Sequence, residues 1–149
     1  MSLMSIFDIS GSAMSAQSVR LNTTASNMAN ANSAAASPDQ VYRSRQPVFA
    51  TIQAQMLNQA NANDFGFSSD GQSGFGVQVL DIVESDAPFQ QRYEPEHPMA
   101  DGEGYVYYPN VNIVEEMTNM ISSSRSFQAN VDVMNSARTM MQRVLTLGQ

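Results

Sequence analysis

The chain has 149 residues, a formal net charge of −7, seven arginines and no cysteine or lysine. Without cysteine, neither disulfides nor thiolate metal sites can form. The scattered arginines form no basic patch for phosphates or anionic head groups, so we expect no nucleic-acid binding. No apolar run reaches the roughly 20 residues of a membrane helix. The first residues also lack the basic flank and unbroken apolar stretch of a cleaved secretory signal.

The N-terminal segment, residues 1–37, predicts a long helix over 3–30 followed by a linker of small residues. Apolar side chains recur every seven residues at Phe7, Met14, Leu21 and Met28. A stripe this narrow cannot bury itself alone. We therefore expect a partner helix, either from the other end of the chain or from another subunit.

The middle, residues 38–109, predicts a small and irregular β-rich region. Alternating side chains indicate a strand within 42–52, where Pro47 favours an edge or a strand start. Further strands are expected at Val77–Val83, Phe89–Tyr93 and Tyr105–Tyr108. Because Val77–Val83 is apolar on both faces, we expect it to be covered on both. Residues 53–63 are ambiguous between helix and loop, and residues 64–76 indicate a flexible segment with four glycines and three phenylalanines.

The C-terminal segment, residues 110–149, predicts a second long helix with two rows of side chains at heptad spacing. The first row is Ile113, Met120, Phe127, Met134 and Met141; the second, four residues later, is Met117, Ser124, Val131, Arg138 and Leu145. The expected fold is mainly α with a small β-rich middle. In it, the long terminal helices pack as a coiled-coil-like core.

Few residues suggest chemistry. His97 lies near Glu94, Glu96 and Asp101, which could describe a metal site, but prolines flank the histidine and favour a solvated loop. Glu94 and Glu96 could serve a glycosidase only if one acid lay in an apolar pocket, and their surroundings offer none. We expect no catalytic residues, no metal, no cofactor and no small-molecule substrate.

Three motifs resemble one family. Ala13–Leu21 followed by Ala25–Ala31 resembles the N-terminal signature of bacterial flagellar rod and hook proteins. Glu115–Met117 with Ser124–Asn130 resembles the matching C-terminal signature. Between them, Glu94–Asn112 resembles the stretch that marks proximal-rod members of that family.

The resemblance implies a structural subunit of the flagellar basal-body rod, the drive shaft that crosses the periplasm. Family members polymerise through their terminal helices, so the implied partners are other rod proteins and copies of the chain itself. They leave the cell through the flagellar type III export apparatus without a cleaved signal peptide. The alternatives are a secreted type III needle or translocator component and a wall-degrading glycosidase.

The predicted assembly interface comprises the apolar heptad positions and three tyrosines. Its residues are Phe7, Met14, Leu21, Met28, Ile113, Met117, Met120, Phe127, Val131, Met134, Met141, Leu145, Tyr105, Tyr107 and Tyr108. For the loop that holds the tyrosines, two interpretations stay open. It is either an acidic surface loop, or a loop that packs on adjacent subunits with the tyrosines as anchors.

Overall fold

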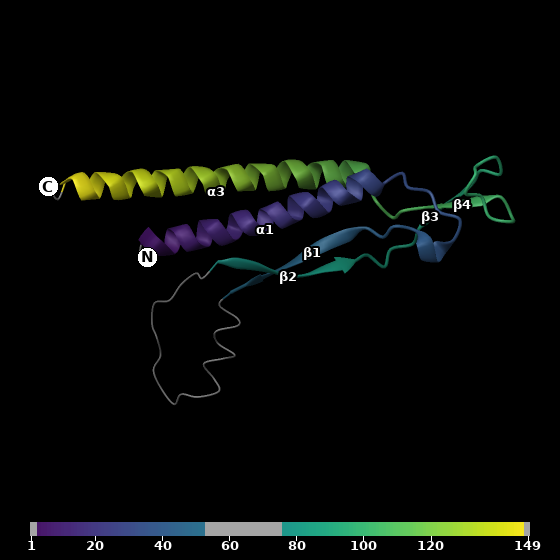
Figure 1. Ribbon diagram of the computed structural model, residues 1–149, viewed down its shortest axis with the longest axis horizontal. Helices are drawn as coiled ribbons and strands as arrows, with labels where there is room; N and C mark the ends of the chain where they lie inside the picture. Colours follow the sequence, from purple (N-terminus) through teal and green to yellow (C-terminus); the bar gives the residue numbers. More distant parts are fainter. Residues whose placement is uncertain (1–2, 53–75, 148–149) are drawn as a thin grey trace, which may run out of the picture. The chain divides into compact units, whose positions relative to one another are not determined.

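The computed structural model describes residues 3–52 and 76–147, so the expectations for 53–63 and for 64–75 fall outside it. In chain order, the elements are α1 (Leu3–Asn30), the short 3-10 helix η1 (Pro38–Gln40), β1 (Arg45–Thr51), β2 (Val77–Glu84), β3 (Gln90–Tyr93), β4 (Tyr105–Tyr108) and α3 (Ile113–Leu147) (Figure 1). Along the chain, two long terminal helices thus flank a small region of antiparallel strands. The sequence predicted the two helices and the small β-rich region between them.

The start of α3 is set by a capping residue. The Asn112 side-chain oxygen accepts hydrogen bonds from the amides of Val114 (3.1 Å) and Glu115 (3.4 Å). These bonds satisfy two of the amides that a helix start leaves without partners. Glu115 and Glu116 lie in the first turn, where the positive end of the helix dipole stabilises acidic side chains.

The chain divides into two compact units, and each contains part of both terminal helices. The first unit consists of Met1–Val19, Val48–Asp81 and Ser123–Gln149, and the second of Arg20–Pro47 and Ile82–Ser122. In the second unit, the end of α1 lies beside the start of α3 and runs in the opposite direction (Figure 1). One contact there is the 3.1 Å hydrogen bond from the Arg20 guanidinium to the Asn119 side chain.

Two pairs of strands complete the described fold. β1 pairs with β2. At one end of the pair, the amide of Ser85 donates to the carbonyl of Ser44 (2.8 Å). At the other end, the amide of Ile52 donates to the carbonyl of Gly76 (3.2 Å). β3 and β4 form an antiparallel pair in which Arg92 lies opposite Val106. Val106 is fully buried.

The expectation that β2 is covered on both faces is wrong. Leu80, Ile82 and Val83 are 56%, 45% and 50% exposed. β1 pairs along the edge of β2, whereas a face of a strand is buried only by another layer packed on the sheet, and the described chain leaves these side chains without such cover. An apolar run by itself does not say how many layers of structure surround it.

The positions that the helices bury within the described chain are small or polar, while the predicted apolar seam residues are half-buried or exposed. On α1 the buried positions are Ser10, Ala16, Thr23, Thr24 and Asn27, and on α3 they are Glu116, Ser123 and Ala137. The buried residues of α3 are seven and fourteen residues apart, and the first of them lies one residue before the predicted Met117. Small side chains allow close approach of a neighbouring helix, so the larger Met117 is left outside and is 48% exposed.

Candidate assembly site

Asn27 is the centre of a buried polar cluster in the second unit. Its side chain is on α1 and the residue is 1% exposed. The side-chain NH2 donates to the Glu116 carboxylate (2.8 Å) and to the Arg45 carbonyl (2.8 Å), with the Ser44 hydroxyl more distant at 3.5 Å. The side-chain oxygen accepts from the Tyr42 hydroxyl (2.9 Å) and from the Arg45 amide (3.0 Å). Both donors and both acceptor positions of the amide group are therefore used.

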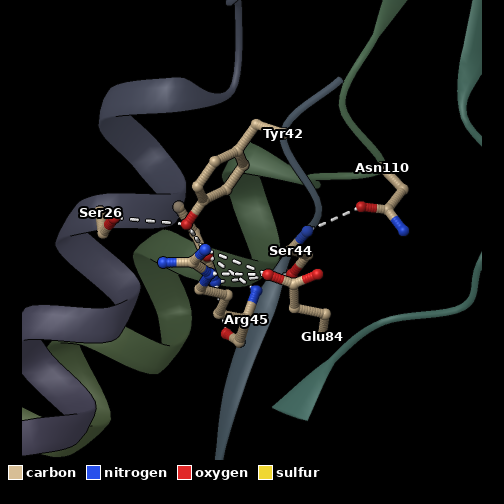
Figure 2. A network of polar contacts seen from close by, with 7 residues as sticks. Ser26, Tyr42, Ser44, Arg45, Glu84 and Asn110 are labelled. Atoms are coloured by element: carbon tan, nitrogen blue, oxygen red, sulfur yellow. Dashed lines mark hydrogen bonds and ion pairs between the residues drawn. The ribbon is translucent and has the colours of Figure 1, made fainter. Parts of the chain in front are cut away.

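Further contacts extend this cluster toward β2 and toward the residues after β4 (Figure 2). The Asn110 side chain accepts from the Ser44 amide (2.8 Å) and donates to the carbonyls of Ser85 (3.2 Å) and Ala87 (2.9 Å). Arg45 pairs with Glu84 at 3.0 Å, at half-exposed positions. We call Asn27, Tyr42, Ser44, Arg45, Asn110 and Glu116 the polar clasp.

The polar clasp joins three parts of the chain that are distant in sequence: the end of α1, the residues leading into β1, and the start of α3. Asn27 and Glu116 both lie inside the family motifs of the sequence, but no local pattern indicates a role for either. The sequence offered one clue, which is that Asn27 precedes the seam residue Met28. A polar group buried on a helix needs a hydrogen-bond partner.

The residues between β3 and β4 form a second polar group around Asp101. Its carboxylate accepts from the amides of Glu103 and Tyr105, each at 2.9 Å, and from the Tyr107 hydroxyl at 3.4 Å. The hydrogen bond from the Tyr105 amide is the largest cause that lowers the pKa of Asp101 from its ordinary value. Asp101 therefore stays ionised and holds the turn.

The predicted tyrosine anchors make contacts within this loop. The Tyr108 hydroxyl donates to the Glu94 carboxylate at 3.1 Å, and this bond raises the pKa of Tyr108. The ring of Tyr105 packs edge-on against Tyr93, with 5.3 Å between ring centroids, and Tyr105 is 36% exposed. Tyr107 and Tyr108 are half-buried. Each tyrosine therefore contributes to holding the β3–β4 pair together.

The His97 ring also has a local partner, since its Nδ1 accepts from the Met99 amide at 3.1 Å. Within residues 3–52 and 76–147, no three histidine, aspartate or glutamate side chains are grouped as metal ligands would be. In the same residues, no helix combines the length and apolarity needed to cross a membrane.

The predicted seam residues are placed at two levels of burial. Nine are half-buried: Phe7, Met14, Leu21, Met28, Met120, Phe127, Val131, Met134 and Met141. Three are exposed: Ile113 (37%), Met117 (48%) and Leu145 (68%). Among the described residues, the structure adds exposed apolar side chains on α3 that the heptad pattern missed, namely Val114 (72%), Ile121 (56%), Val133 (48%), Met140 (57%) and Val144 (62%).

Five exposed apolar residues of α3 form two groups, one in each unit. In the second unit, Val114, Met117 and Ile121 are spaced three and four residues apart, so they lie on one side of α3 and form an apolar ridge. In the first unit, Val133 and Met140 line a largely apolar hollow of about 280 Å³ together with Ile6 of α1.

Comparison with known proteins defines the class. Residues 7–34 match the family described as flagella basal body rod protein, and residues 103–147 match the family described as flagellar basal body rod FlgEFG protein C-terminal. The two matches cover most of α1 and all of α3. The chain belongs to the flagellar basal-body rod family.

Within that family, the chain is similar over its whole length to proteins named flagellar basal-body rod protein FlgC. It is 49% identical to that of Escherichia coli O6:H1 (strain CFT073) and 48% identical to that of Salmonella typhimurium (strain LT2), over 149 residues and all of both chains. Identity to the Bacillus subtilis (strain 168) protein is 35% over 148 residues and 95% of each chain. The expected resemblance to this member of the rod family is thereby confirmed over the whole chain.

Proposed function

We propose that the chain is a structural subunit of the flagellar rod, and that it polymerises through its terminal helices with other rod proteins and with copies of itself. The observation that carries this proposal is the exposed apolar surface of α3. Val114, Met117 and Ile121 are 72%, 48% and 56% exposed on one side of a helix. Burying apolar surface contributes roughly 25 cal/mol per Å², so this ridge favours association with a neighbouring subunit.

The same proposal assigns different roles to the segments of the chain. Residues 1–37 and 110–149 form the core of the rod as coiled-coil-like helices, and residues 38–109 face outward. Support comes from the few charges on α1, where Asp8 and Arg20 are the only charged residues. A helix with so few charges is suited to close packing on several sides. The predicted interface residues, including the tyrosines, then lie at or near contacts between subunits.

Export completes the proposal. The chain reaches the periplasmic rod through the flagellar type III export apparatus without a cleaved signal peptide. It acts without catalytic residues, cofactor, nucleic acid or direct membrane insertion. Of the two acids that a glycosidase would need, Glu94 accepts a hydrogen bond from Tyr108 and Glu96 is exposed, so neither lies in an apolar pocket. Nothing in the described residues favours a needle or translocator component over a rod subunit.

A carboxylate placed on the apolar ridge tests the proposal. In cells where the variant is the only copy, Ile121→Asp should abolish rod formation and motility, because a charge buried in a subunit interface without a partner costs several kcal/mol. Ser122→Asp is the matched control, since Ser122 is the adjacent exposed residue and is already polar. Isolated basal bodies and swimming assays report the result. Normal rods in Ile121→Asp cells would contradict the proposal.

A further inference from the structure

Between α1 and α3 in the second unit, the hydrogen bond from Arg20 to Asn119 is only part-buried, whereas the bond from Asn27 to Glu116 is buried. The apolar Leu21, Met28 and Met120 on these parts of the helices are half-buried, and the buried Thr23 and Thr24 are small. Methionine is unbranched and flexible, so it can repack against shifted neighbours. A slip of one helical turn, about 5.4 Å, would leave such contacts similar in kind.

The bond between Asn27 and Glu116 does define the alignment. Glu116 is 6% exposed and accepts from the Asn27 side chain at 2.8 Å. A slip of one turn would separate the two groups, leaving a buried carboxylate without this donor and a buried amide without this acceptor. Unpaired buried polar groups are disfavoured far more than a repacked apolar contact. Single buried asparagines fix register in coiled coils for the same reason.

Asn27 also carries this alignment to the β region. Its side chain bonds to both the amide and the carbonyl of Arg45, the first residue of β1, in the way that a neighbouring strand would. Tyr42, three residues earlier, donates to the same side-chain oxygen. The start of β1 is therefore held by a side chain whose own position depends on the pairing of α1 with α3.

We propose that Asn27 is a positioning residue that sets the register of α1 against α3 and, through Arg45, orders the start of β1. While the terminal helices are apart, the segment before β1 lacks this anchor. Once the helices pair, the anchor forms in one alignment only. This inference goes beyond the proposed function and does not rest on it, because every contact involved lies within one chain.

Distance measurement between two spin labels tests the register directly. The chain has no cysteine, so Ala29→Cys and Ser122→Cys give two exposed labelling sites, on α1 and α3. Since Asn27 faces Glu116 and Arg20 faces Asn119, these sites are offset along the helix axes, and a slip changes their separation. Pulsed electron paramagnetic resonance on the full chain should give one narrow distance.

The informative variant replaces both partners by leucine. Asn27→Leu with Glu116→Leu fills the site with apolar groups, so the helices can still pair. We expect the helix signal in circular dichroism to be retained, the single distance to split into several populations, and the hydrogen exchange of the Arg45 amide to rise at least tenfold. The matched control, Asn22→Leu with Glu115→Leu, changes the same residue types at exposed positions and should keep one distance.

Three results would overturn the proposal. One is an unchanged single distance in the variant with Asn27→Leu and Glu116→Leu. Another is a loss of helix in that variant, which would show that the pair acts on stability instead of alignment. The third is the absence of a defined distance in the labelled chain that keeps Asn27 and Glu116.

Discussion

The carboxyl group of Asp101 organises the turn between β3 and β4, and its ionisation makes that turn sensitive to pH. The bound amides of Tyr105 and Glu103 favour the ionised form, so the folded pKa lies below the unfolded one of about 3.9. A group with a lowered folded pKa contributes stability above the unfolded pKa, and this contribution is lost as pH falls through the folded pKa.

We therefore expect the β3–β4 pair to loosen in acid through Asp101. NMR shifts of the Glu103 and Tyr105 amides should titrate below pH 4 in the natural chain. In Asp101→Asn the side-chain oxygen still accepts from both amides, so the turn should persist while this titration disappears. Glu94, which accepts from Tyr108, is present in both chains, so its influence cancels in the comparison. An identical titration in Asp101→Asn would contradict the assignment.

Two glycines in the first unit provide a second test at the scale of single residues. Gly76 has φ +100°, and a Cβ there would collide with the Ser12 side chain, whose oxygen accepts from the Val77 amide at 3.2 Å. Gly76→Ala should therefore destabilise the start of β2 by about 1–3 kcal/mol. At Gly11, inside α1, an added Cβ meets no atom within 4 Å. Gly11→Ala should instead stabilise the helix by about 1 kcal/mol.

Amide exchange at Val79 and in α1 would measure both effects. Faster exchange at Val79 is expected in Gly76→Ala only, and slower exchange in α1 in Gly11→Ala only. Equal behaviour of the two variants would show that neither the backbone conformation at Gly76 nor its contact with Ser12 matters.

At the scale of elements, the sequence predicted the helices well because a heptad pattern is a direct record of helical geometry. The bounds of α1 and the span of β4 agree with expectation. Within the chain, α3 buries Glu116, Ser123 and Ala137, each one residue before a member of the second seam row, and the role of that row in assembly stays a prediction. Periodicity reveals that a face exists, but close packing of small residues decides which face is buried.

The clasp was not predictable for a related reason. Asn27 and Glu116 are 89 residues apart, and no local pattern connects a buried amide on one helix with a buried acid on another. The same holds for the exposure of β2, which depends on how many strands and layers surround it. Local propensity describes an element, whereas burial is a property of its neighbours.

The two units predict uneven stability along the helices of the purified chain. Both units leave apolar side chains of α3 exposed, but in the second unit the polar clasp joins the end of α1 to the start of α3. Apolar burial offsets an ordering cost of roughly 1–2 kcal/mol per residue, so helix with little burial should fray.

Hydrogen exchange on dilute monomer should therefore show protection over 20–30 and 113–122 that exceeds protection over 3–19 and 123–147. Circular dichroism should show less helix than the 28 and 35 residues of α1 and α3. Strong protection throughout both helices in the monomer would contradict this expectation, since it would mean that the chain alone stabilises them.

For the whole molecule, the central claim is that the chain builds the rod by burying the apolar surface of α3 against neighbouring subunits. Family membership is shown by full-length similarity to FlgC proteins, while the contacts themselves remain our proposal. The β3–β4 tyrosines already have partners within the chain, so the α3 ridge is the stronger candidate for assembly. An interface that repeats along a helical assembly needs a different surface on each side of the subunit.

The most direct test is a cryo-EM map of the isolated basal body at side-chain resolution. The account predicts that Val114, Met117 and Ile121 are buried between subunits, with α1 and α3 in the wall of the rod. It would be contradicted by a map in which this ridge faces solvent and the subunits contact one another through residues 38–109 alone.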